Sequence, residues 1–170
     1  VNTTQTPAIR IIINSHNQLR SLLFFKINLL GLNYPSPIII LDYNRRMKTI
    51  IALAQTEIIY SDPNANFEQS CKLIEDSAAA KAKLILFPEL WSSGYNLPRR
   101  SEIAAQNASL NVELKRLAQE YDITIGGSWI TRRADAYFNT FVLTFPEGQQ
   151  VSYDKTHLFG LIDEEKWLTA

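Results

Sequence analysis

The 170-residue chain has one cysteine, two histidines and no excess of either charge. Cys71 cannot form a disulfide within the chain, which favours a reducing compartment, and we expect a cytoplasmic protein. His16 and His157 lie far from each other and from Cys71, so no metal site is predicted. The 17 Lys and Arg balance the 17 Asp and Glu, which gives no reason to expect a nucleic acid or an anionic membrane as a partner.

Long apolar runs are also lacking. The longest, around residues 21–32, is interrupted by Lys26 and Asn28, which makes it too short and too polar to span a bilayer. A basic residue precedes it, as in a secretory signal, but no small-residue cleavage site follows. We therefore expect 1–46 to be a leader outside the domain, which would start at Met47, directly before a strand-like run.

The first half of the segment 47–170 alternates between strand and helix patterns. Short apolar runs predict buried strands at 48–58 and within 83–90, where Pro88 ends the strand. Between them, Asp62 can cap a helix whose first residue is Pro63. The apolar face of this helix is predicted from residues that recur at three- and four-residue steps: Phe67, Cys71, Ile74, Ala78 and Ala82.

The second half predicts one more helix and three strands. The helix starts near Ser101, and the strands cover 123–131, 137–145 and 149–155, with a tight turn at 146–148. The helix is predicted to bury one face, formed by Ile103, Leu110, Leu114, Leu117 and Tyr121. The order β-α-β-α-β-β-β indicates an α/β domain with a mixed sheet. If the helices cover one face of this sheet, its other face is left apolar and needs a further layer.

Glu89 is the first candidate for chemistry. It follows the apolar run "LILF", at the end of a strand, where open α/β sheets bind ligands. Partial desolvation there is expected to raise the pKa of its carboxyl group, which suits a general base. The alternative, which spacing alone favours, is a surface glutamate at the start of a loop.

Lys155 and Glu164 are the next candidates, with His157 between them. Lys155 ends the last predicted strand, and a lysine near a carboxylate can stabilise an oxyanion. The alternatives are an exposed lysine at a strand end and, for Glu164 in "LIDEEKWL", a solvated glutamate at the start of a helix. His157 could orient the loop by hydrogen bonding, or be a structural histidine.

Cys71 is the only thiol, but it is not predicted to be a nucleophile. It lies on the same predicted helix face as Phe67 and Ile74, so it should be buried, protonated and packed as a small apolar residue. A flavodoxin-like nucleotide site is also disfavoured, because no glycine-rich loop follows the first strand.

The segments from about 47 to 170, taken together, resemble the nitrilase superfamily of carbon–nitrogen hydrolases. "LILFPELWSSGYNL" resembles the first catalytic block of that family, with Glu89 in the place of the general base. "YDKTHLF" resembles the second block, with Lys155 in the place of the catalytic lysine, and "LIDEEKWLTA" places Glu164 where many members carry a second active-site glutamate.

The resemblance implies an incomplete α-β-β-α sandwich, of which 47–170 is the N-terminal part. The third block of the family, with the nucleophilic cysteine, would follow Lys155 by some tens of residues, and the chain ends at Ala170. We therefore expect the chain as given to be inactive. The alternative is a non-catalytic truncated half-domain or an interaction module.

For the intact enzyme, the resemblance implies a Cys-Glu-Lys triad that hydrolyses a small amide or, less readily, a nitrile, without a cofactor. Glu89 would be the base, Lys155 would stabilise the oxyanion, and Glu164 would hold Lys155 or the substrate amide. "FPELWSSGY" and "HLFGLIDEE" look most like the omega-amidase branch, which acts on the amides of small dicarboxylic acids. A homo-oligomer is expected for the intact enzyme.

Overall fold

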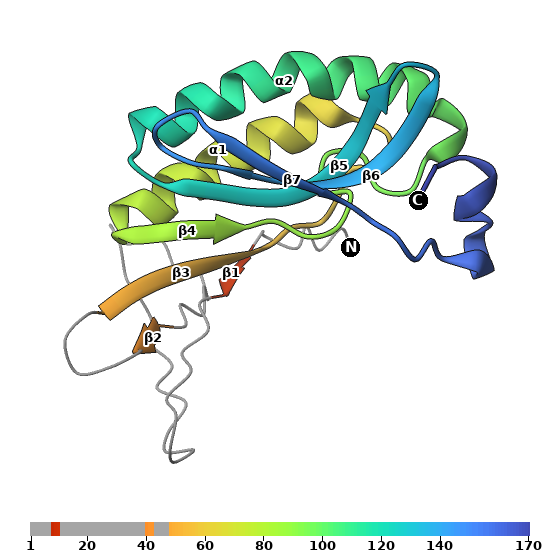
Figure 1. Cartoon of the computed structure of the whole chain (residues 1–170). Helices are drawn as coiled ribbons and strands as arrows, with labels where there is room; N and C mark the ends of the chain where they lie inside the picture. The colour runs from red at the N-terminus through yellow and green to blue at the C-terminus, as the bar shows by residue number, and fades with distance from the viewer. Residues whose placement is uncertain (1–7, 11–39, 43–47) are drawn as a thin grey trace.

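The computed structural model describes residues 8–10, 40–42 and 48–170 (Figure 1). Most of the segment 1–46 lies outside the described residues, so its assignment as a leader stays a prediction. Two short strands within it, β1 (Ala8–Arg10) and β2 (Ile40–Asp42), pair antiparallel with β3 (Lys48–Gln55).

The sheet is mixed, as predicted. After β3 come β4 (Ala82–Leu86), β5 (Thr124–Arg133), β6 (Ala136–Thr144) and β7 (Gln150–Asp154), and the strands lie in the order β1-β3-β4-β5-β6-β7. β3, β4 and β5 are parallel to one another, and β6 is antiparallel to both of its neighbours. The β-α-β-α-β-β-β order predicted for 48–170 is therefore confirmed.

Two helices, α1 (Pro63–Ala79) and α2 (Arg100–Glu120), lie on the same side of the sheet (Figure 1). α1 starts as predicted, with Pro63 at its first position and the Asp62 carboxylate accepting a hydrogen bond from the amide of Ala65 at 3.0 Å. Both helices pack against the sheet and against each other. They supply much of the main core together with Ile85, Ile125, Trp129 and Val142 of the strands.

The buried face of α1 differs in part from the predicted one. Phe67 and Ile74 are buried, but Cys71 is only half-buried, and Ala82 belongs to β4 rather than to the helix. The helix ends at Ala79, so the three- and four-residue pattern ran past its end. Small polar side chains such as Ser70 and Ser77 fill the rest of the buried face, because each hydroxyl donates to a backbone carbonyl of the helix.

The sheet face opposite the helices carries apolar side chains with large exposed areas. Val142 is part of the core on the helix side, so its neighbours Phe141 and Leu143 point the other way. Their partners across the strand pair are Tyr153 and Val151, each 61% exposed. The sequence predicted this apolar face. Exposed patches of this kind mark surfaces that pack against other structure.

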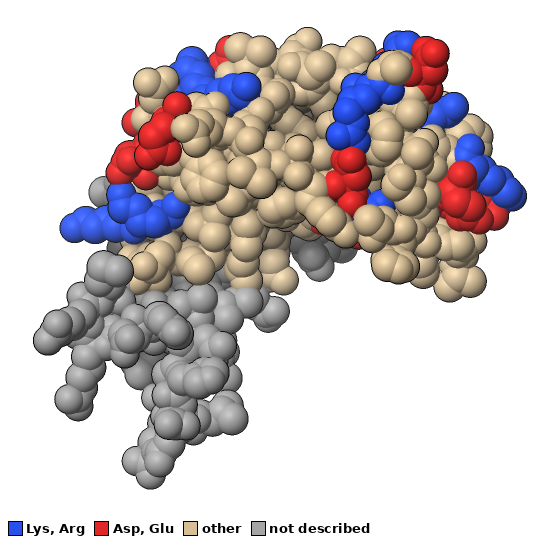
Figure 2. All heavy atoms as spheres, in the orientation of Figure 1, with Lys and Arg blue, Asp and Glu red and all other residues tan. Residues whose placement is uncertain are grey.

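Charged side chains form small mixed groups, with basic and acidic residues side by side, on the face shown in Figure 2. Ion pairs along the helices include Lys72–Asp76, with 2.8 Å between the charged atoms. Among the helices that the structure describes, none is both long enough and apolar enough to cross a membrane.

Candidate active site

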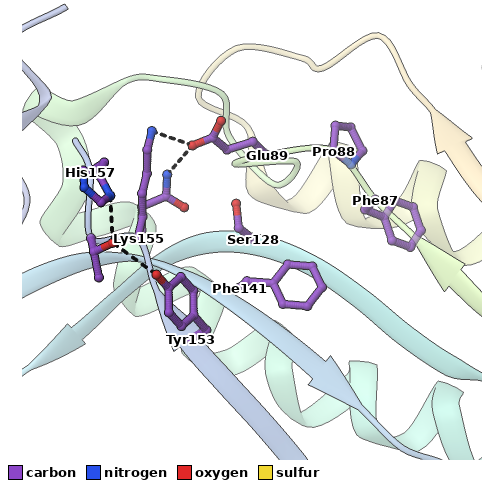
Figure 3. Close-up of a pocket in the computed structure, with 10 residues that line it drawn as sticks. Phe87, Pro88, Glu89, Ser128, Phe141, Tyr153, Lys155 and His157 are labelled. Atoms are coloured by element: carbon purple, nitrogen blue, oxygen red, sulfur yellow. Dashed lines mark hydrogen bonds and ion pairs between the residues drawn. The ribbon is translucent and has the colours of Figure 1, made fainter. Parts of the chain in front are cut away.

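The strand directions bring Glu89 and Lys155 to the same edge of the sheet. β6 runs antiparallel to both β5 and β7, so β4, β5 and β7 all point the same way. Glu89 follows β4 and Lys155 follows β7. The Lys155 ammonium donates a hydrogen bond to Oε1 of Glu89 at 2.9 Å, although 66 positions separate the two residues (Figure 3). Glu89 and Lys155, which the resemblance assigned to one site, are therefore in direct contact.

The loop that carries Glu89 begins directly after β4. The sequence predicted that Pro88 ends this strand, and β4 does end at Leu86, because Pro88 has no amide hydrogen for the sheet ladder. The loop stays attached to β5 through side-chain and backbone contacts: the amide of Leu90 donates to the Ser128 hydroxyl at 2.9 Å. This attachment fixes the position of Glu89 relative to the sheet.

Gly127 of β5 lets this loop approach the strand closely. A Cβ atom there would lie 2.6 Å from the ring of Trp91 and 2.9 Å from Cβ of Phe87, closer than side chains pack. Trp91 in turn stacks on Trp129, with 5.7 Å between the ring centroids. Through these contacts the aromatic side chains of the loop pack on β5.

Glu164 lies in the same cluster, as predicted, but it is buried rather than solvated. It is 0% exposed, at the start of a short 3-10 turn (Glu164–Lys166). Its Oε2 accepts from the Lys155 ammonium at 2.8 Å and from the amide of Phe159 at 2.7 Å. The buried side chain of Leu168 packs in a second core cluster and anchors the segment that follows.

Asn139 joins the two carboxylates, and no motif in the sequence pointed to it. It is 2% exposed in β6, and its Nδ2 donates to Oε1 of Glu89 at 2.7 Å and to Oε1 of Glu164 at 3.2 Å. Its backbone carbonyl accepts from the amide of Lys155 at 2.9 Å. The available signal was an asparagine inside the apolar strand "YFNTFVLTF", because a polar residue at such a position needs a partner.

The pKa of Glu89 moves in the opposite direction to that expected. Desolvation is the largest single influence and raises it, but hydrogen bonds from Lys155, Tyr95 and Asn139, with the charge of Lys155, bring the pKa below its usual value. Conversely, desolvation lowers the pKa of Lys155, and the two carboxylates more than offset this, so it is raised. Glu89 and Lys155 are thus both charged at neutral pH.

A cavity of about 410 Å³ opens beside this cluster (Figure 3). Glu89 and Lys155 lie at its charged end, and Phe87, Pro88 and Phe141 supply apolar walls. His157 also lines it, and its Nδ1 lies 3.1 Å from the hydroxyl of the adjacent Thr156. The cavity is large enough for a small organic molecule with one polar group.

Cys71 does not line the cavity. It lies on α1 and packs against the main core, where desolvation, partly offset by the charge of Arg116, raises the pKa of its thiol. A raised pKa keeps it protonated and poorly nucleophilic, as predicted. Within 48–170 the structure shows no group of three His, Cys, Asp or Glu side chains placed to hold a metal ion.

The chain matches the model of a family described as carbon–nitrogen hydrolase over residues 50–169. It is 34% identical over 127 residues to the 2-oxoglutaramate amidase of Bacillus subtilis, a match that covers 73% of this chain and 49% of the amidase. The chloroplastic omega-amidase of Arabidopsis thaliana is 34% identical over 135 residues, which cover 71% of this chain and 36% of that protein. The chain thus spans about half the length, or less, of the curated relatives it matches.

Solved structures show the same fold. A CN-hydrolase superfamily protein from Xanthomonas campestris superimposes with a TM-score of 0.66 at 26% identity, over 71% of this chain and 45% of that one. An amidase from Nesterenkonia sp. superimposes with a TM-score of 0.62 at 25% identity, over 71% of this chain and 46% of the amidase. The two helices and the mixed sheet of residues 48–170 therefore form part of a nitrilase-like α/β fold.

Proposed function

Because the chain belongs to the carbon–nitrogen hydrolase family, we propose that residues 48–170 supply the base and the oxyanion-stabilising group of an amidase site. Glu89 is the general base, Lys155 stabilises the oxyanion, and Glu164 holds Lys155 in place. The convergence of these three side chains beside one cavity is the observation that carries the proposal.

Lys155 has the donor geometry that this role needs. An ammonium group has three N–H donors, and the hydrogen bonds to Glu89 and Glu164 use two of them. The third is free to donate to an oxyanion in the cavity. Because Glu164 is fully buried, it holds the ammonium more firmly than a solvated carboxylate could.

Glu89 has the exposure that a base needs. Its side chain is 44% exposed, whereas Glu164 is 0% exposed, so only Glu89 of the two can exchange a proton with a group in the cavity. The lowered pKa of Glu89 keeps the carboxylate deprotonated at neutral pH, but it also makes Glu89 a weaker base than the raised pKa expected from the sequence would have done.

The nucleophile in this proposal is a cysteine thiol supplied from outside residues 48–170. Glu89 takes the thiol proton while sulfur bonds to the amide carbon, and Lys155 stabilises the oxygen anion that forms. Glu89 then gives this proton to the amide nitrogen as the C–N bond breaks and ammonia leaves. Glu89 next takes a proton from water, which bonds to the acyl carbon; the C–S bond breaks, the acid leaves, and the proton returns from Glu89 to the sulfur. Because Cys71, the one cysteine of the sequence, does not line the cavity, we expect no turnover by this chain alone.

The substrate class follows from the relatives. Those named for an activity are mostly amidases acting on the amide of a small dicarboxylic acid, and one, from Pyrococcus abyssi, is named a nitrilase. We therefore place an amide of this kind first and a nitrile second. The homo-oligomer expected for the intact enzyme stays a prediction.

A chimera tests the proposal. Residues 48–170 replace the matched segment of the Bacillus subtilis 2-oxoglutaramate amidase, and ammonia release from 2-oxoglutaramate is measured for the chimera and for the chain alone. We expect steady release by the chimera and none by the chain. Release by the chain alone would contradict the need for an external thiol, and its loss in Cys71→Ser would make Cys71 the nucleophile. A folded but inactive chimera would favour a non-catalytic half-domain.

A further inference from the structure

Among the residues that the structure describes, Asn139 alone contacts Glu89, Glu164 and the backbone of Lys155 at once. Its Nδ2 donates to Oε1 of both glutamates, at 2.7 Å and 3.2 Å, and its backbone carbonyl accepts from the amide of Lys155 at 2.9 Å. Oε1 of Glu89 receives the Lys155 ammonium as well. The four side chains therefore close a ring of hydrogen bonds around the charged end of the cavity.

A second buried asparagine, Asn107, differs from Asn139 in the partners of its side-chain hydrogen bonds. Asn107 of α2 is also 2% exposed, and its Nδ2 donates to the backbone carbonyl of Ile130 at 2.9 Å. That bond ties a helix to a strand. Asn139 instead directs both N–H groups of its amide to carboxylates of the proposed site.

We propose that Asn139 is a positioning residue, which holds the Glu89 and Glu164 carboxylates on the Lys155 ammonium through a single amide nitrogen. A role of Asn139 in catalysis rests on the proposed function. The positioning of two carboxylates by one amide does not depend on that function.

The charges in the ring explain why a neutral donor suits this position. Two carboxylates share one ammonium, so they repel each other unless further donors stabilise both. An amide supplies two N–H donors without adding a second positive charge, which would compete with Lys155 for the carboxylates. The other titratable side chains facing Glu89 are Tyr95, and His157 and Tyr153 across the cavity.

Two substitutions at Asn139 distinguish the effect of its hydrogen bonds from the effect of its side-chain volume. Asn139→Ala removes both hydrogen bonds, whereas Asn139→Asp keeps the shape but exchanges two donors for a third negative charge. Asn139→Ala should therefore move the titration of Glu89 upward, and Asn139→Asp should move it further upward, because it adds repulsion.

The experiment is a titration of the side-chain carboxyl carbons of the full 170-residue chain by NMR. Wild type, Asn139→Ala, Asn139→Asp and Asn107→Ala are compared, the last being a control of equal burial with no carboxylate contact. We expect the Glu89 midpoint to rise in both Asn139 variants and to stay at the wild-type value in Asn107→Ala. An unchanged midpoint in the Asn139 variants, or an equal rise in Asn107→Ala, would overturn the proposal.

If Asn139→Ala does not fold, Asn139→Leu gives the same test of the Glu89 midpoint, because leucine has nearly the shape of asparagine but neither a charge nor a donor. Two outcomes keep the inference apart from the proposed function. If the midpoint moves as expected while the chimera with the Bacillus amidase releases no ammonia, the positioning by Asn139 stands and the proposed amidase site fails. If the chimera is active and the midpoint does not move, only the role of Asn139 fails.

Discussion

Replacing Lys155 by methionine removes the only cation that the structure places against two carboxylates in the described site. Glu164 is 0% exposed and Glu89 is 44% exposed, and both lie within 3 Å of the Lys155 ammonium. Methionine keeps most of the side-chain volume, so the substitution mainly deletes the charge. The buried Glu164 carboxylate would then keep only its hydrogen bonds from Phe159 and Asn139.

The cost follows from the burial of Glu164. Removing one partner of a buried ion pair typically costs 3–5 kcal/mol, and we expect about 3 kcal/mol here, because Lys155 is itself 25% exposed. Most of this comes from Glu164, since a pair as exposed as Glu89–Lys155 contributes roughly 0–1 kcal/mol. Lys83→Met is the matched control. Lys83 pairs with Asp122 at the surface, with 63% and 75% exposed side chains, so its loss should cost less than about 1 kcal/mol.

Urea denaturation at neutral pH measures both variants against wild type. A cost for Lys155→Met within about 0.5 kcal/mol of that for Lys83→Met would refute the burial reasoning.

The pH dependence of the free energy of unfolding is a second check. The pKa of Glu89 is lowered in the folded state, so Glu89 stabilises the fold above the usual pKa of a glutamate, and this stabilisation is lost as pH falls through the folded-state pKa. The pKa of Lys155 is raised, so Lys155 stabilises the fold below the usual pKa of a lysine, and this stabilisation is lost as pH rises through the raised pKa. The difference between wild type and Lys155→Met should thus be largest between about pH 5 and pH 10.

Two further predictions concern the frame around the site. Gly127→Ala forces a Cβ against Trp91 and Phe87 and should cost about 1–3 kcal/mol in urea denaturation, whereas Gly160→Ala, which meets no atom within 4 Å, should change stability by less than about 0.5 kcal/mol; equal costs would mean that the loop adjusts freely. A chain starting at Met47 should keep the melting temperature of the full chain if 1–46 is a leader. A clear drop would mean that the pairing of β1 and β2 with β3 stabilises the sheet.

The order of strands and helices was predictable because each element carries its own local pattern. Asp62 and Pro63 define the start of α1 from two adjacent residues. Pro88 likewise predicted the break after β4, which ends at Leu86. The end of α1 was not predicted correctly, because the three- and four-residue pattern continues to Ala82, which belongs to β4. Apolar spacing predicts burial, but it does not report where a helix ends.

The meeting of Glu89 and Lys155 was predictable only from the resemblance, which placed both residues in motifs of one site. Spacing alone favoured a surface position for each of them. The burial of Glu164 and the role of Asn139 depend on the path of the chain after β7 and on side-chain contacts across three elements. The direction of the Glu89 pKa was wrong for the same reason. Desolvation can be expected from neighbouring apolar residues, but two of the donors that outweigh it, Asn139 and Lys155, are far away in sequence, and the contact with the nearby Tyr95 depends on the fold of the loop.

The turnover of the Glu89→Gln chimera tests the proposed site most directly. In the Bacillus amidase chimera that carries residues 48–170, ammonia release from 2-oxoglutaramate should fall at least about 100-fold on loss of the base. Glu147→Gln, at an exposed turn between β6 and β7, is the matched control and should leave the rate unchanged. A Glu89→Gln chimera that folds like its parent and keeps its rate within about twofold would contradict the assignment of Glu89 as the general base.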